Sequence, residues 1–143
     1  LRLARLSAQT LDRINALAPS WQRMGNPADI WPATMIAGHP MDEVFRTTFE
    51  AFLSDDDVSA VILIFAGFPE MGEQAAIDPT ADIPRIAQRF EGKPVLFWLY
   101  GPDVKPMARR LEGTGRIMVY PTLDRALRAL SRLNQYWEHV QAG

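Results

Sequence analysis

Two stretches of the chain are apolar almost throughout, at residues 58–65 and 95–100. A strand covered by helices on both faces has this composition, so both stretches are predicted as parallel strands, with the first in the centre of the sheet. A shorter apolar run predicts a third strand at 117–120. Residues 1–6 alternate apolar and charged side chains, which predicts a short half-buried strand at the start of the chain.

Helical spacing of apolar side chains fills most of the intervals between these strands. Serine or threonine caps, glycines and prolines mark the ends of the predicted helices. Residues 20–40 have no periodicity and carry successive turn signals, so they are predicted as a long loop, ordered by Trp21 and Trp31. The first predicted helix starts at Ser7 and ends near Pro19. The next three cover 41–53, 81–91 and 104–111, and the last starts at Thr122.

Strands that alternate with helices predict a parallel sheet with helices on both faces. Right-handed crossovers make this a three-layer αβα sandwich of flavodoxin-like or Rossmann-like type. The length of 143 residues suits a single domain, which we assign to 1–143. Because the chain begins with leucine, we expect it to be a fragment of a longer multidomain protein.

Composition excludes several classes of protein. The net charge is −2 and the basic residues are dispersed, which argues against a nucleic-acid partner. The longest apolar run is far shorter than the roughly 20 residues of a membrane span. The chain has no cysteine, which excludes disulfides and thiolate chemistry and suits a cytoplasmic location. The run Asp55-Asp56-Asp57 has no companion ligands, so we predict a solvated turn rather than a metal site.

The turn after the first apolar strand is the first candidate for a functional site. It reads Ala66-Gly67-Phe68-Pro69, and ligands in open α/β sheets bind at the carboxyl ends of strands. Neither a glycine-rich nucleotide motif nor a G-x-S-x-G elbow is present. His39 is the only plausible catalytic imidazole, but no carboxylate is identifiable to orient it, so we favour a structural or exposed role.

Four motifs, in a fixed order along the chain, are more specific than these patterns. They are Met24-Gly25-Asn26-Pro27-Ala28-Asp29, the run Leu53-Ser54-Asp55-Asp56-Asp57-Val58, Lys93-Pro94-Val95, and Val119-Tyr120-Pro121-Thr122 followed by residues 125–130. Together they resemble the nucleoside-diphosphate-forming acyl-CoA synthetases, the superfamily that includes succinyl-CoA ligase. The resemblance covers essentially the whole chain and is to the flavodoxin-like ligase domain, which in the succinyl-CoA ligase β subunit follows the ATP-grasp part.

The resemblance implies a domain that helps to form the acyl-substrate and phosphohistidine site of an ATP-coupled enzyme. The domain alone is expected to be inactive and to bind no cofactor itself, whereas CoA and ATP or ADP with Mg belong to the parent. The expected partners are the CoA-binding, phosphohistidine and ATP-grasp domains, with no nucleic acid and no membrane. The phosphohistidine belongs to another domain, so neither His39 nor His139 takes that role.

The resemblance also implies the substrate-binding residues, and no metal ligands or catalytic residues. Gly67, Phe68 and Pro69 match a turn that contributes backbone groups to the acyl site. Gly25, Asn26 and Asp29 match a Gly-Asn-Pro-x-Asp loop near the same end of the sheet, for which a purely structural role is about equally plausible.

Family members carry a first strand and helix ahead of the segment that matches Leu1, and this chain lacks both. We therefore expect a gap beside the strand at 58–65, filled by an unseen segment, a rearrangement or another chain. Two other interpretations stay open. The parent could be a regulatory, CoA-sensing relative fused to an acetyltransferase, or the chain could be an unrelated flavodoxin-like binding domain.

Overall fold

The computed structural model describes residues 1–66, 79–102 and 104–141. Helices and strands alternate through most of this part of the chain. In order, they are α1 (Ala8–Asn15), α2 (Trp31–Met35), α3 (Met41–Ser54), β1 (Val61–Ala66), α4 (Pro79–Gln88), β2 (Val95–Tyr100), α5 (Val104–Glu112), β3 (Ile117–Tyr120) and α6 (Leu123–Gln141).

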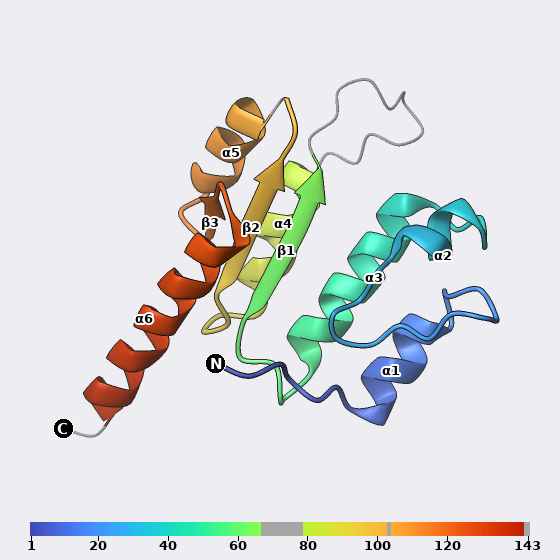
Figure 1. Ribbon diagram of the computed structural model, residues 1–143, viewed down its shortest axis with the longest axis horizontal. Coiled ribbons are helices and arrows are strands. Elements are labelled where there is room, and N and C mark those ends of the chain that lie inside the picture. Colours follow the sequence, from blue (N-terminus) through green and yellow to red (C-terminus); the bar gives the residue numbers. More distant parts are fainter. Residues whose placement is uncertain (67–78, 103, 142–143) are drawn as a thin grey trace.

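The three strands form a parallel sheet in the order β1-β2-β3 (Figure 1). Val61 of β1 pairs with Val95 of β2, which pairs with Ile117 of β3. These three side chains point to one face, because paired residues of parallel strands share a face. All three are buried in a core that α3, α4 and α5 complete, with Phe97 fully buried among them.

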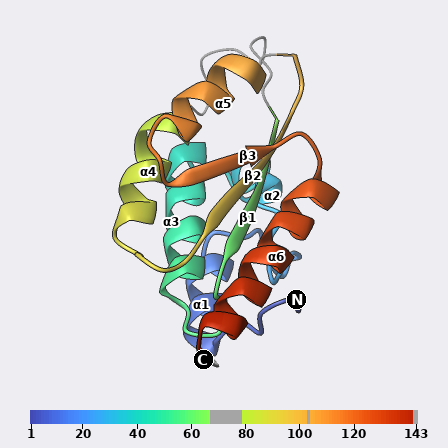
Figure 2. The same cartoon turned by 90° about the vertical axis from the view of Figure 1, so that its left-hand side faces the viewer.

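Helix α6 lies on the other side of the sheet from α3 and α4 (Figure 2). It packs against β2 and β3, where Leu96 is completely buried. Helices therefore cover both faces of a parallel sheet, which confirms the predicted three-layer flavodoxin-like architecture.

A second apolar cluster joins the first three helices. Ile14 of α1, Ala33 of α2 and Val44 of α3 are fully buried in it. Met24, from the connection between α1 and α2, is buried there too. The segment before β1 is therefore ordered on its own small core, as the tryptophans at 21 and 31 had suggested, although both of those side chains are exposed.

Three predictions about the fold are wrong. Residues 1–6 form no strand, because side chains elsewhere bind their backbone groups in place of a sheet ladder. The predicted loop at 20–40 contains α2, which begins with a proline in its first turn. Finally, β1 is an edge strand of the described sheet and not its centre, since β2 is its only neighbour among the described strands.

Candidate functional site

The carboxyl ends of the strands and the amino ends of several helices meet at one edge of the sheet. The ring of Phe45, one turn into α3, lies 6.4 Å from that of Phe65, near the end of β1. Thr122 follows β3 and accepts a hydrogen bond from the amide of Arg125, so it caps α6 as predicted. Such an edge presents unpaired amide groups and positive helix ends, which favour anionic ligands.

The predicted residues Gly67, Phe68 and Pro69 lie outside the described part of the chain. In the sequence they directly follow Ala66, which is the last residue of β1. Ala66 pairs with Tyr100, the last residue of β2. The next residue, Gly101, has a φ of 111°, a backbone conformation that favours glycine and turns the chain out of the sheet.

The other predicted residues, Gly25, Asn26 and Asp29, lie in a loop held by its own polar contacts. The amide side chain of Asn26 donates to the carbonyl oxygen of Ala4 at 3.1 Å. A carboxylate oxygen of Asp29 accepts from the amide of Trp31 at 3.1 Å, which helps to begin α2. These two contacts give Asn26 and Asp29 a structural role.

The structure does not place these three residues together at the carboxyl edge. Asn26 contacts Ala4, and the next residue, Arg5, binds Asp57 just before β1 begins. Asn26 therefore lies near the amino end of β1, whereas Asp29 leads into α2 and α3. A hypothetical Cβ on Gly25 meets no atom within 4 Å, so no close approach requires glycine there.

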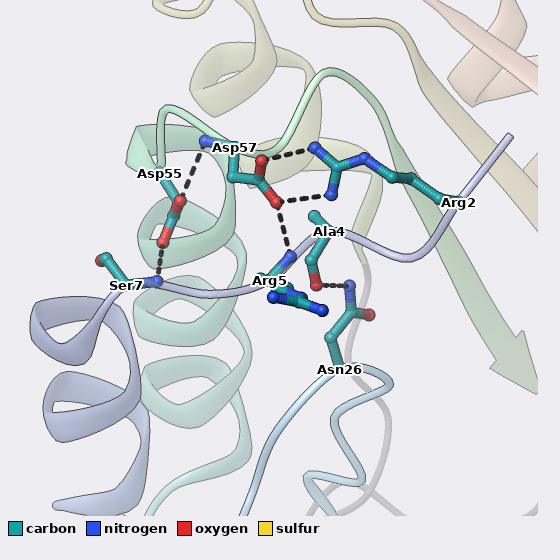
Figure 3. Close-up of polar contacts among 7 residues, drawn as sticks. All are labelled: Arg2, Ala4, Arg5, Ser7, Asn26, Asp55 and Asp57. Carbon is teal, nitrogen blue, oxygen red and sulfur yellow. Dashed lines mark hydrogen bonds and ion pairs between the residues drawn. The ribbon is translucent and has the colours of Figure 1, made fainter.

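Asp55 and Asp57 form the most developed polar cluster, on the turn between α3 and β1 (Figure 3). Asp57 accepts two hydrogen bonds from the guanidinium of Arg2, at 2.6 and 3.0 Å, and one from the amide of Arg5. Asp55 accepts from the amide of Ser7 at 2.8 Å. We call these contacts the N-terminal clasp, because they fasten residues 2–7 to the amino end of β1.

The clasp changes the acidity of both carboxyl groups. Hydrogen bonds from Arg2 and from the Arg5 amide lower the pKa of Asp57 to about 2. Hydrogen bonds from the Thr10 hydroxyl and the Ser7 amide lower the pKa of Asp55 to about 2 as well. Both groups are therefore charged at neutral pH and already bound to the protein, which suits anchoring and not proton transfer.

Lys93 supports the same turn from the other side. Its ammonium group donates to the carbonyl oxygens of Leu53 and Asp55, at 2.8 and 2.7 Å, and so satisfies the end of α3. Sequence reasoning did not identify these roles of Asp55, Asp57 and Lys93. Their partners lie 38 to 55 positions away, so no local spacing signals them.

A surface hollow of about 410 Å³ lies beside the clasp, at the amino end of β1 and thus opposite the expected ligand edge. Arg5, Arg13 and Asp56 line it, together with the two clasp aspartates. Both clasp carboxylates are already occupied by protein donors, so this hollow is a weak candidate for a substrate site. The described residues include no cluster of three side chains placed to hold a metal ion. None of the described helices is long and apolar enough to span a membrane.

No protein-family model matches the sequence. The acetate–CoA ligase (ADP-forming) II of Archaeoglobus fulgidus is 28% identical over 138 residues, which are 95% of this chain and 19% of the ligase. The chain thus spans about a fifth of that relative. Among solved structures, PH0766 from Pyrococcus horikoshii OT3 superposes with a TM-score of 0.65 at 25% identity, over 85% of this chain and 26% of that one. These matches confirm the resemblance of the chain to the nucleoside-diphosphate-forming acyl-CoA synthetases.

Proposed function

We propose that this chain is a domain of a nucleoside-diphosphate-forming acyl-CoA synthetase and helps to form its acyl-substrate and phosphohistidine site. The observation that carries the proposal is the sequence match to an ADP-forming acetate–CoA ligase along 95% of the chain. Since the chain spans only 19% of that ligase, the remaining steps belong to other domains. These are the CoA-binding, phosphohistidine and ATP-grasp domains, with ATP or ADP, Mg and CoA bound by the parent in the cytoplasm.

The described geometry supports a role for this domain in binding the acyl group, with the remaining steps in other domains. The chain offers an edge with a strand end at Ala66 and a capped helix start at Thr122, which suits binding and orienting an anionic acyl group. In this proposal Gly67, Phe68 and Pro69 form a wall of the acyl site directly after Ala66. Proline has no amide donor, so the carboxylate of the substrate binds to the neighbouring amides or to a partner domain.

Gly25, Asn26 and Asp29 remain second candidates for this site. Their described contacts support a structural role, because Asn26 binds Ala4 and Asp29 binds the amide of Trp31. Asp29 is the stronger of the two polar candidates, since it leads into α2 and then α3, whose Phe45 lies against Phe65.

The test uses the full-length parent protein with ATP, Mg, CoA and a panel of short carboxylic acids. Formation of both ADP and an acyl-CoA is expected, with one acid preferred. If the pure protein forms neither product with any acid, while still binding CoA, the regulatory alternative replaces this proposal. A variant with Phe68→Ala reports on the acyl wall within the same assay.

A further inference from the structure

Helix α2 presents a group of large apolar side chains to solvent. Trp31 and Met35 lie four residues apart and so share one face of the helix, and Ile36 follows directly. Their exposed fractions are 41%, 68% and 61%. We call these three residues the α2 patch. Single exposed apolar side chains are common on proteins, whereas a contiguous group marks a surface that another molecule or domain covers.

The opposite side of α2 holds the patch in a fixed position. Ala33 is completely buried in the apolar cluster that joins α1, α2 and α3. The carboxylate of Asp29 accepts a hydrogen bond from the amide of Trp31, and the hydroxyl of Thr34 donates to the sulfur of Met41 at 3.4 Å. An apolar surface that is already ordered loses little conformational entropy when a partner binds to it.

The α2 patch lies at the carboxyl edge of the sheet. Helix α2 leads into the start of α3, where the ring of Phe45 lies 6.4 Å from that of Phe65, near the end of β1. In Figure 1, α2 is at the end of the molecule toward which the β1 arrow points. The proposed acyl-substrate and phosphohistidine site forms at this edge, and its phosphohistidine belongs to another domain. A second domain therefore has to reach the edge beside α2.

The charges around the α2 patch indicate the chemistry of its partner. Helix α2 has no charged side chain, and Asp42 and Glu43 are exposed in the first turn of α3. Asp42 binds Arg46, whereas Glu43 forms no ion pair with any other residue that the structure describes. This acidic rim repels the anionic headgroups of a membrane surface and attracts lysine or arginine.

We propose that the α2 patch is a docking surface for another domain of the parent protein, whose apolar contact residues are flanked by lysine or arginine. This inference rests on the proposed function, because it takes the partner to be the domain that meets this one at the carboxyl edge. The sequence match covers only 19% of the related ligase, so such a protein has other domains that can dock here. Tryptophan and methionine are enriched in the cores of protein interfaces. Docking excludes water from the edge and so strengthens the binding of an anionic substrate there.

The experiment places a photocrosslinking side chain at Ile36 of the full-length parent, and mass spectrometry identifies the crosslinked peptides. Crosslinks to residues outside 1–143 are expected, on a peptide that carries apolar and basic side chains. Crosslinks confined to residues 1–143 would instead identify a second copy of this domain or the chain itself as the occupant and would overturn the proposal. The absence of any crosslink would overturn it as well.

Two substitutions at equally exposed apolar residues test the position of the surface. Met35→Lys places a positive charge in the α2 patch, and Tyr136→Lys places one on α6, where Tyr136 is 64% exposed. Both variants are expected to melt at the parent temperature, since neither side chain is in the core. Met35→Lys should lower the crosslink yield by about fivefold or more and Tyr136→Lys should leave it unchanged. Equal yields from the two variants would refute docking at the patch.

A third variant tests the charge of the partner. Glu43→Lys reverses the charge of the rim and should lower the crosslink yield by about threefold or more, because it then repels a basic partner. An unchanged yield would refute the basic character of that partner.

The crosslink does not depend on catalysis, so it is measured separately from the reaction. Formation of ADP and acyl-CoA is followed on the same samples. Crosslinks to another domain in a parent that forms no product would refute the proposed function alone, and product formation without crosslinks would refute the docking alone.

Discussion

Replacing Asp55 by asparagine removes a charge from a carboxylate that the fold has enclosed. The side chain is 4% exposed and accepts from the amides of Ser7 and Asp57, at 2.8 and 3.1 Å. Asparagine has the same size and keeps one acceptor oxygen. The variant therefore tests the charge of Asp55 with little change in packing.

The expected loss follows from the acidity of Asp55. Its pKa falls from 3.8 to about 2 on folding, because the Thr10 hydroxyl and the Ser7 amide bind the charged form. At about 1.4 kcal/mol for each unit, this contributes about 2 kcal/mol to the free energy of unfolding. The folded pKa is the lower one, so the contribution is complete above about pH 5 and decreases as the pH falls through 4 towards 2.

Urea denaturation of both proteins at about pH 7 and about pH 3 measures this effect. Asp55→Asn should be less stable by about 2 kcal/mol at the higher pH and by about half of that at the lower. Asp56→Asn, on the same turn, should change stability by less than about 0.5 kcal/mol at either pH. An equal loss for Asp55→Asn at both pH values would refute the electrostatic reasoning and leave only a packing effect.

Three further predictions concern the lysine, the core and the acyl wall. Lys93→Met should destabilise the chain by about 1 to 3 kcal/mol in urea denaturation, because two carbonyl oxygens of the α3 end lose their donor, while Lys105→Met should be close to neutral. Ile86→Val, at a side chain 1% exposed, should cost about 0.5 to 1.5 kcal/mol, and Ile64→Val on β1, at a residue 54% exposed, should cost less than half as much; equal costs would show that Ile64 is buried in solution. In the full-length parent, Phe68→Ala should raise the KM for the carboxylic acid by about tenfold and leave the KM for ATP unchanged; a change confined to ATP would exclude the acyl wall.

The elements that the sequence predicted well are those whose own side chains determine burial. β2 and β3 have the predicted bounds, because an apolar run without polar interruption suits only a covered strand. Helix α3 also begins at the predicted residue, with Asp42 and Glu43 in its first turn.

The errors arose where distant residues decide the conformation. The alternation of residues 1–6 predicts a strand, but no strand pairs with them, and Asp57 binds the amide of Arg5 instead. The three consecutive aspartates were interpreted as a solvated turn, yet two of them bind the start of the chain across about 50 positions. Separations of that size leave no periodic trace in a sequence.

For the candidate site, sequence analysis predicted residues at the carboxyl edge of the sheet, and the structure describes only Gly25, Asn26 and Asp29 among them. β1 ends at Ala66, one residue later than predicted, and the residues proposed as the acyl wall follow Ala66 in the sequence but lie outside the described part of the chain. The Gly-Asn-Pro-x-Asp loop was expected at the same end, whereas Asn26 contacts Ala4 near the opposite end. A motif fixes the order of residues in the sequence, but it does not determine at which end of the sheet a long connecting loop lies.

The register of the parallel sheet also has a consequence for how the chain folds. Val95 and Ile117 are paired across a connection of 22 positions, whereas Val61 and Val95 are paired across 34. Closing the longer loop costs about 0.4 kcal/mol more entropy, and its connection includes the long segment between β1 and α4. Loop entropy therefore favours pairing of β2 with β3 over pairing of β1 with β2 only slightly, by less than the thermal energy of about 0.6 kcal/mol. During synthesis β1 leaves the ribosome before β2 and β3, so this apolar strand stays unpaired by them until they have been synthesised.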